Sequence, residues 1–256
     1  MLEKIKSQYC LNFIIKDHLT NKKYLSLFSY SNNFQKKLNI SIIDYEKIFN
    51  QIEIELELSL IYPLKEDKNI FVQLRDNYEQ FVNIYINNKK EKRNYITKDE
   101  YNGKLPKIKL VIDDGIFTLA RLFKNCKCIQ QINFTKCNRD DITNMYEMFM
   151  GCESLIKINI NKLKTDNVTN MGSMFYGCSS LKELDLSKFK FYNVNNTFEM
   201  FAFCSSLNKL EMINFVVNHK MNTRFMFSHC SEELKNKIMG EFKDLNEFAF
   251  LDYVEE

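Results

Sequence analysis

The sequence predicts an α/β solenoid, in which copies of one short unit stack on each other. A constant interval of 26 residues separates the members of a cysteine column, which are Cys126, Cys152, Cys178, Cys204 and Cys230. Apolar residues recur at the same interval on both sides of each cysteine, which indicates about five copies. A repeat of this length is typical of stacked folds, because one unit cannot bury its own apolar face whereas neighbouring units form a continuous core.

Two further columns support the same interval. The phenylalanine column consists of Phe123, Phe149, Phe175, Phe201 and Phe227. The asparagine column consists of Asn144, Asn170, Asn196 and Asn222. The agreement of so many positions predicts that equivalent residues lie above one another in successive repeats.

The first part of each repeat has the spacing of a short helix. The central copy has apolar residues at the spacing i, i+3, i+4, i+7, which are Met171, Met174, Phe175 and Cys178. A helix would place these four residues on one apolar stripe. Asn170 precedes them as an N-cap residue, whose side-chain oxygen can accept from a free N–H group of the first turn. The sequence therefore predicts one short helix in each repeat.

The second part of each repeat has the period of a strand. In the central copy, Leu184 and Leu186 alternate with Glu183 and Asp185. This period of two predicts a strand with one buried side and one side that faces solvent. Stacked repeats would bring such strands together into a sheet.

The residues 167–187, NVTNMGSMFYGCSSLKELDLS, resemble the BspA-like surface-protein repeat of 26 residues, which is a divergent leucine-rich repeat. The resemblance covers about residues 115–230. It implies a right-handed, leucine-rich-repeat-like solenoid and a role in binding other proteins. Some bacterial members of that family are surface adhesins for host matrix proteins.

The pattern changes along the chain and predicts four parts. They are a small helical module at 1–50, a β-rich segment at 51–112 that caps the solenoid, the solenoid at 113–230, and a C-terminal helical cap at 231–256. The helical module weakly resembles an F-box-like module, and a plain helical bundle is the alternative. In the β-rich segment, the alternation from Ile52 to Leu60 predicts a strand with an acidic solvent face, and Lys107–Ile112 is expected to lead into the first repeat. Ser231 is the expected N-cap of the last helix.

Composition and charge exclude several classes of function. The net charge of +3 is too small to indicate a nucleic-acid-binding protein. No apolar run approaches the ~18 residues that a membrane span needs, and the first residues do not have the pattern of a signal peptide. We therefore expect a cytoplasmic protein and a monomer. The cysteine column has the translational spacing of a ladder, which favours buried free thiols over disulfides.

The residues that carry most enzyme chemistry are few and dispersed. The three histidines, His18, His219 and His229, do not form a metal-binding or nucleophile-activating motif. Cys126 and Cys128 lack the paired spacing of a zinc site. We therefore predict a protein that is not an enzyme and that needs neither a cofactor nor a metal.

Strand geometry identifies the candidate binding residues. Because alternate side chains of each predicted strand point inward, the residues between them must point out, and stacked strands would join them into one face. The candidates are Gln131, Asn133, Lys157, Asn159, Glu183, Asp185, Lys209 and Glu211. Their mixed charges and amides predict a protein–protein interaction module that binds a protein partner through this face. The alternatives are an exported adhesin-type protein, an F-box-like adaptor with the repeats as its receptor, or a merely solvated face with binding at 1–50.

Overall fold

A computed structural model describes residues 51–58, 68–74, 78–97, 106–113 and 115–253. The chain divides into two compact units, Met1–Gln51 and Ile52–Glu256, and the second unit contains all of these residues except Gln51. The helical module predicted for 1–50 lies outside the described residues. So does His18.

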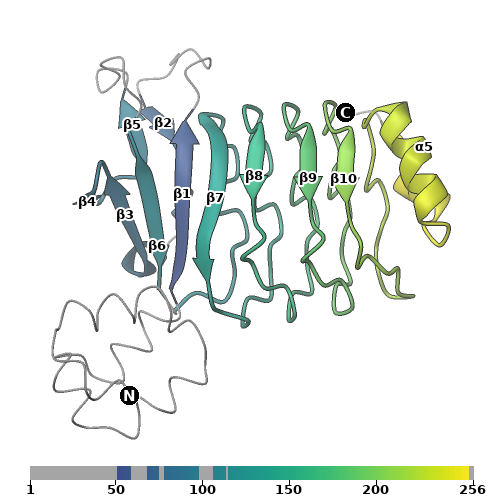
Figure 1. Cartoon of the computed structure of the whole chain (residues 1–256), viewed down its shortest axis with the longest axis horizontal. Helices are drawn as coiled ribbons and strands as arrows, with labels where there is room; N and C mark the ends of the chain where they lie inside the picture. The colour runs from purple at the N-terminus through teal and green to yellow at the C-terminus, as the bar shows by residue number, and fades with distance from the viewer. Residues whose placement is uncertain (1–50, 59–67, 75–77, 98–105, 114, 254–256) are drawn as a thin grey trace, which may run out of the picture. The chain divides into compact units, whose positions relative to one another are not determined.

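The largest element of the second unit is a six-stranded mixed sheet with the order β4-β3-β6-β1-β7-β8 (Figure 1). Its strands are β1 (Ile52–Leu58), β3 (Val82–Ile86), β4 (Lys89–Glu91), β6 (Ile108–Ile112), β7 (Ile129–Cys137) and β8 (Lys157–Asn159). All neighbouring pairs are antiparallel except β7 and β8, which are parallel. Two small sheets accompany it. One is the antiparallel pair β2 (Lys68–Ile70) and β5 (Tyr95–Thr97), and the other is the parallel pair β9 (Glu183–Asp185) and β10 (Lys209–Glu211).

The alternation in β1 explains its central position. Ile52, Ile54, Leu56 and Leu58 are buried, whereas the three glutamates between them lie on the opposite side of the strand. β1 pairs antiparallel with β6 on one side and with β7 on the other. The predicted strand at 107–112 is present as β6 and precedes the first repeat along the chain, but the strand that pairs with β7 in the sheet is β1.

The predicted right-handed α/β solenoid is also wrong. In the described ranges the repeats contain no helix, and the single α-helix is α5 (Glu232–Glu241), which follows them. The repeat strands do not form one continuous sheet either, because β7 and β8 belong to the large mixed sheet while β9 and β10 form a separate pair. The other helical elements in the described part of the chain are short 3-10 turns, η2 (Glu79–Phe81) and η4 (Glu247–Ala249).

Backbone conformation is the reason that the expected helices do not form. Ser173 and Gly177 have φ angles of 51° and 68°, and Glu147, Gly151 and Glu199 occupy the same left-handed region in neighbouring repeats. A right-handed helix needs negative φ at every residue, so a left-handed residue at every fourth position interrupts it. The segment is instead a series of tight turns, such as those in which Met174 N–H donates to the Met171 carbonyl and Cys178 N–H to the Phe175 carbonyl.

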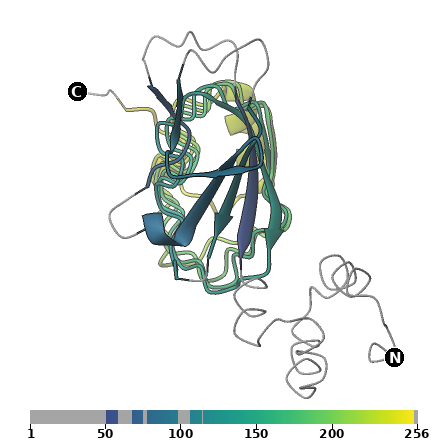
Figure 2. The same ribbon diagram turned by 90° about the vertical axis from the view of Figure 1, so that its left-hand side faces the viewer.

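The N–H groups between these turns bond to the next repeat. Met171, Ser173, Phe175 and Gly177 each donate to a main-chain carbonyl 25 residues later, at distances of 2.7 to 2.9 Å. Equivalent bonds join the other copies, and backbone bridges link each asparagine of the column to the next. We call this hydrogen-bonded array the repeat stack. In Figure 2 the backbones of successive repeats overlap in projection.

The interior of the repeat stack is a ladder of phenylalanine rings. Phe149, Phe175 and Phe201 are fully buried, and neighbouring rings stack with centroids 5.3 and 5.9 Å apart. Phe250 extends the ladder beyond Phe227, with centroids 5.5 Å apart. The sequence did not predict this last ring, because its spacing from Phe227 departs from the 26-residue interval.

The cysteine column lies beside the phenylalanine ladder. The thiols of Cys152, Cys178, Cys204 and Cys230 each donate to the carbonyl of a phenylalanine in the preceding repeat, at 3.0 to 3.2 Å. The seven described cysteines are all free and buried. Burial raises the pKa of Cys178 and Cys204 well above the ordinary thiol value and that of Cys230 to about 12.

Both ends of the repeat stack are covered. At the N-terminal end, Gln73 donates through its main chain to the Leu122 carbonyl and through its side chain to the Lys124 carbonyl. At the C-terminal end, α5 follows the last repeat, and Ser231 caps it by accepting from Leu234 N–H at 3.3 Å. This confirms the predicted helix and its N-cap.

Phe175→Ala should destabilise the protein strongly. Loss of a fully buried ring between two stacked neighbours typically costs ~3–5 kcal/mol, because apolar burial is lost and a cavity remains. Lys182→Ala is the control, since this side chain is exposed. The free energy of unfolding measured in denaturant should fall for the first variant and barely change for the second. Equal effects would contradict the assignment of the ladder.

The thiol column should make the fold sensitive to alkaline pH. Burial raises the thiol pKa in the folded state, so the folded state keeps its thiol protons at a pH at which the unfolded state loses them. The contribution of the buried thiols to the free energy of unfolding is therefore complete below the pKa of an unfolded thiol, about 8.5, and is lost as pH rises above it. Each buried thiol should contribute a slope of up to ~1.4 kcal/mol per pH unit. We expect Cys178→Ala combined with Cys204→Ala to flatten the fall in unfolding free energy between about pH 9 and 10.5. An unchanged slope would contradict this prediction.

Candidate functional site

The solvent side of the six-stranded sheet carries a regular array of polar side chains. Strand register places Tyr85, Lys109, Glu55, Asn133 and Asn159 in one row across five neighbouring strands. A second row joins Glu57, Gln131 and Lys157. These residues reach solvent because the alternate residues of the same strands fill the core.

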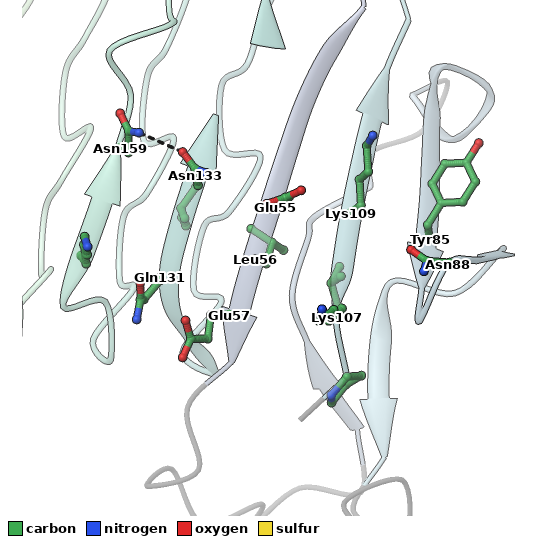
Figure 3. A pocket seen from close by; sticks show the side chains of 14 residues that line it. Glu55, Leu56, Glu57, Tyr85, Asn88, Lys107, Lys109, Gln131, Asn133 and Asn159 are labelled. Atoms are coloured by element: carbon green, nitrogen blue, oxygen red, sulfur yellow. Dashed lines mark hydrogen bonds between the residues drawn. The ribbon is translucent and has the colours of Figure 1, made fainter. Parts of the chain in front are cut away.

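The array surrounds a hollow of about 670 Å³, which we call the first hollow (Figure 3). Its lining comes from β1, β3, β6, β7 and β8 and the turns beside them. The lining residues are Glu55, Leu56, Glu57, Tyr85, Asn88, Pro106, Lys107, Ile108, Lys109, Gln131, Ile132, Asn133, Lys157 and Asn159. Leu56, Ile108 and Ile132 border the hollow although they are buried, because their side chains fill the core on the opposite side of the sheet.

A second hollow of about 520 Å³ lies where the large sheet ends and the β9–β10 pair begins. It is lined by Ile156, Lys157, Ile158, Lys182, Glu183, Leu184, Asp185, Lys209 and Glu211. Ile156 is 44% exposed, so this hollow combines apolar and charged groups.

The eight candidate residues from the sequence divide between the two hollows. Gln131, Asn133 and Asn159 line the first, and the four acidic and basic candidates on β9 and β10 line the second. Lys157 lines both and therefore joins them. Gln131 and Asn133 are half-buried, and the other six are exposed.

Sequence reasoning missed the part of the first hollow that comes from β1 and β6. The alternation of 52–58 indicated that Glu55 and Glu57 face solvent. It could not show that β1 lies beside β7, because this pairing joins segments about 75 residues apart in the chain. Lys107 and Lys109 gave no separate signal, since lysine is common on any exposed strand.

Ion pairs occupy one end of the β1 face. The Glu53 carboxylate lies 2.5 Å from the Lys109 ammonium and 3.8 Å from that of Lys136. Desolvation lowers the pKa of Lys136, and the Glu53 carboxylate opposes this effect. Lys109 is thereby held toward Glu53, at the end of the strand opposite to Glu57.

The other two carboxylates of β1 have a different environment. Within the described residues, no hydrogen bond or ion pair engages the carboxylate of Glu55 or Glu57, and both residues are exposed. Across the strand from them lie the amides of Asn133 and Gln131. Asn159 donates to the Asn133 side-chain oxygen at 2.9 Å (Figure 3), and no hydrogen bond within the described residues engages the Asn133 side-chain nitrogen.

The acidic residues of the second hollow are more engaged. Asp185 accepts from Ser187 N–H at 2.8 Å, and hydrogen bonds from Ser187 hold the pKa of this carboxyl below its ordinary value. The Glu183 carboxylate lies 3.8 Å from the Lys209 ammonium, which also lies 3.7 Å from Glu211. Their charges are therefore partly balanced within the protein.

The carboxylate, ammonium and amide groups that line the two hollows are able to form ion pairs and hydrogen bonds. In the described ranges, no three His, Cys, Asp or Glu side chains group as metal ligands do. The described cysteines are buried, and their raised pKa values suppress the thiolate that nucleophilic chemistry requires. His229 stacks on Phe203 with ring centroids 4.3 Å apart, which is a structural contact.

Comparison with known protein families finds one match, which covers the repeat stack. Residues 117–240 match the family described as Mycoplasma protein of unknown function, DUF285. The match begins near the first repeat and ends within α5, so it excludes β1 and β6. No curated protein and no solved structure matches the chain. Within the described ranges, no helix combines the length and apolar character that crossing a membrane requires.

Proposed function

We propose that this protein is a non-enzymatic interaction module that binds a protein partner through the outward face of β1, β6, β7, β8, β9 and β10. The observation that carries the proposal is the arrangement of the candidate residues. Eight residues chosen by strand alternation line two hollows that share Lys157. Their ammonium, carboxylate and amide groups lie on one face of the protein, and none of these groups takes part in core packing.

The dimensions of the face favour a macromolecular partner. The first hollow is bordered by five strands of the sheet, and neighbouring strands lie ~4.8 Å apart, so the polar array extends for roughly 20 Å. Its polar groups lie on a sheet surface and do not converge on one point. Small-molecule sites are typically concave pockets that bury most of their ligand. A segment or surface of another protein can contact the whole array at once.

The BspA-like resemblance of 167–187 supports the same class of function, since that family consists mostly of binding proteins. It also supports the adhesin-type alternative, in which the partner is a matrix protein. In both cases we propose that the protein acts as a monomer.

Reversal of two charges should abolish partner binding without unfolding the protein. Lys157→Glu with Glu183→Lys reverses one charge in each direction and keeps the net charge, so a partner that matches this pattern should lose affinity. Both residues are exposed, and the Glu183 side chain is 70% accessible. Proximity labelling of the full chain, with mass spectrometry, should identify a partner, and binding to that purified partner should then be measured.

The matched control is Lys220→Glu with Asp244→Lys, which makes the same charge changes at exposed residues that line neither hollow. We expect the control to bind like the unmodified protein. If the first variant also binds normally while removal of residues 1–50 abolishes binding, the partner does not use the sheet face.

A further inference from the structure

We propose that one edge of the repeat stack docks on the surface of an anionic lipid bilayer. This edge, which we call the basic edge, consists of the turns that follow β8, β9 and β10, at 161–166, 187–192 and 213–218. The inference goes beyond the proposed function, because no residue of these turns lines either hollow. It rests on the packing of the turns, on their charge, and on the exposed apolar side chains beside that charge.

The three turns lie side by side and are packed in the same way (Figure 1). Each has one buried anchor residue, and the anchors are Leu163, Phe189 and Phe215. Lys190 N–H donates to the Thr165 hydroxyl of the preceding turn at 2.7 Å, and the Asn214 side chain donates to the Ser187 carbonyl at 2.7 Å. The residues immediately before and after each anchor are exposed. The anchors therefore fix which side chains the edge presents to solvent.

In two of the turns, both residues that flank the anchor are lysines. They are Lys162 and Lys164 in one turn and Lys188 and Lys190 in the next. All four are exposed. A cluster of four or more basic residues is the usual minimum for attraction to an anionic lipid surface.

The neighbouring carboxylates do not cancel this charge. Asp166 is the one carboxylate of the two lysine turns, and it forms an ion pair with Lys190. Asp185 on β9 attracts Lys188, but its carboxylate is engaged by Ser187 N–H at 2.8 Å. The two lysine turns therefore carry four positive charges against the single negative charge of Asp166.

The second observation is a group of exposed apolar side chains on the same edge. Ile213 is 77% exposed and Val216 is 65% exposed, the two highest values for large apolar residues in the described part of the chain. Tyr192 in the neighbouring turn is 59% exposed. Val216 has the same place in its repeat as Lys164 and Lys190, so the charged and apolar groups share one edge. Water is an unfavourable environment for such a group of side chains, and a partner that covers them would stabilise the complex.

The two observations together favour a lipid surface among anionic partners. Lysine and tyrosine side chains suit the level of the lipid headgroups, where an apolar stem or ring lies below a polar tip. Ile213 and Val216 gain from the apolar boundary beneath the headgroups. A nucleic acid would match the charge but leave these two side chains in water. The three turns also lack arginine, the residue that binds phosphate groups in bidentate geometry.

Docking through the basic edge is compatible with the proposed partner site. The edge lies beyond the ends of β8, β9 and β10, whereas the candidate partner residues lie on the outward face of these strands. A membrane at the edge would therefore leave the sheet face open to a protein partner.

The test measures cosedimentation of the full chain with two kinds of vesicle. One is pure phosphatidylcholine, and the other contains about one-third phosphatidylserine, which is anionic. At physiological salt, we expect the anionic vesicles to bind at least about tenfold more tightly, because each lysine near such a surface strengthens binding roughly fivefold. Equal binding to both vesicles, or binding to neither, would overturn the proposal.

Two pairs of lysine substitutions locate the binding. Lys162→Gln with Lys188→Gln should weaken binding to the anionic vesicles about thirtyfold. The matched control is Lys89→Gln with Lys90→Gln, which makes the same charge change at exposed residues of the outermost strand β4. That strand lies five strands from β8, which is roughly 24 Å and well beyond the Debye length of about 8 Å. The control should change binding less than about twofold, and an equal loss in both pairs would overturn the proposal.

An apolar pair separates a lipid surface from other polyanions. Ile213→Ser with Val216→Ser should weaken binding to the anionic vesicles about tenfold, because less apolar surface enters the lipid boundary. The unfolding midpoint should not change, since both side chains are exposed. A single-stranded oligonucleotide is the comparison probe. If it binds as tightly as the vesicles and the serine variant weakens neither, the edge binds polyanions in general and the inference falls.

This inference and the proposed function fail separately. Lys157→Glu with Glu183→Lys keeps the net charge and should bind the anionic vesicles like the unmodified protein. If that variant loses its labelled partner while the anionic vesicles bind no protein at all, the interaction module stands and the lipid inference falls. If it loses vesicle binding, the sheet face contacts the lipid and the inference also falls.

Discussion

The repeat stack depends on main-chain hydrogen bonds between turns that are 26 residues apart in sequence. A series of tight turns has an N–H group at every second residue that its own turn cannot satisfy, and a buried N–H without a partner is costly. Here each such group donates to a carbonyl of the next repeat. The requirement sets the distance between repeats, and the side chains of the interior must then conform to that distance.

The interior shows how they do so. Phenylalanine rings that repeat at this distance stack with centroids 5.3 to 5.9 Å apart, within the range that offset aromatic pairs prefer. Cysteine suits the adjacent column because it is small and apolar, and because its thiol can donate weakly to a phenylalanine carbonyl. A larger residue would separate the turns and lengthen the main-chain bonds. A serine would place a more polar hydroxyl in the same buried position.

The sequence predicted the interval and the buried columns, but it did not predict their secondary structure. Met171, Met174, Phe175 and Cys178 are all buried, because a helix and a series of turns can both place this spacing on one side. The distinguishing feature is positive φ, which glycine favours and other residues rarely adopt. In the column of Asn125, Gly151, Gly177, Phe203 and His229, all five residues have positive φ, and only two are glycine. The propensity signal was therefore too weak to exclude helices.

The candidate site shows a similar division between local and long-range information. Alternation is local, so it identified Lys157 and Glu183 as outward residues and the glutamates of β1 as an acidic face. The pairing of β1 with β7 is long-range and depends on how the β-rich segment meets the first repeat. This pairing places Glu55 beside Asn133, and it joins residues outside the DUF285 match to residues within it. The charge pattern of the first hollow thus belongs to the junction, and a chain with the same repeats but another strand beside β7 would carry a different charge pattern on this face.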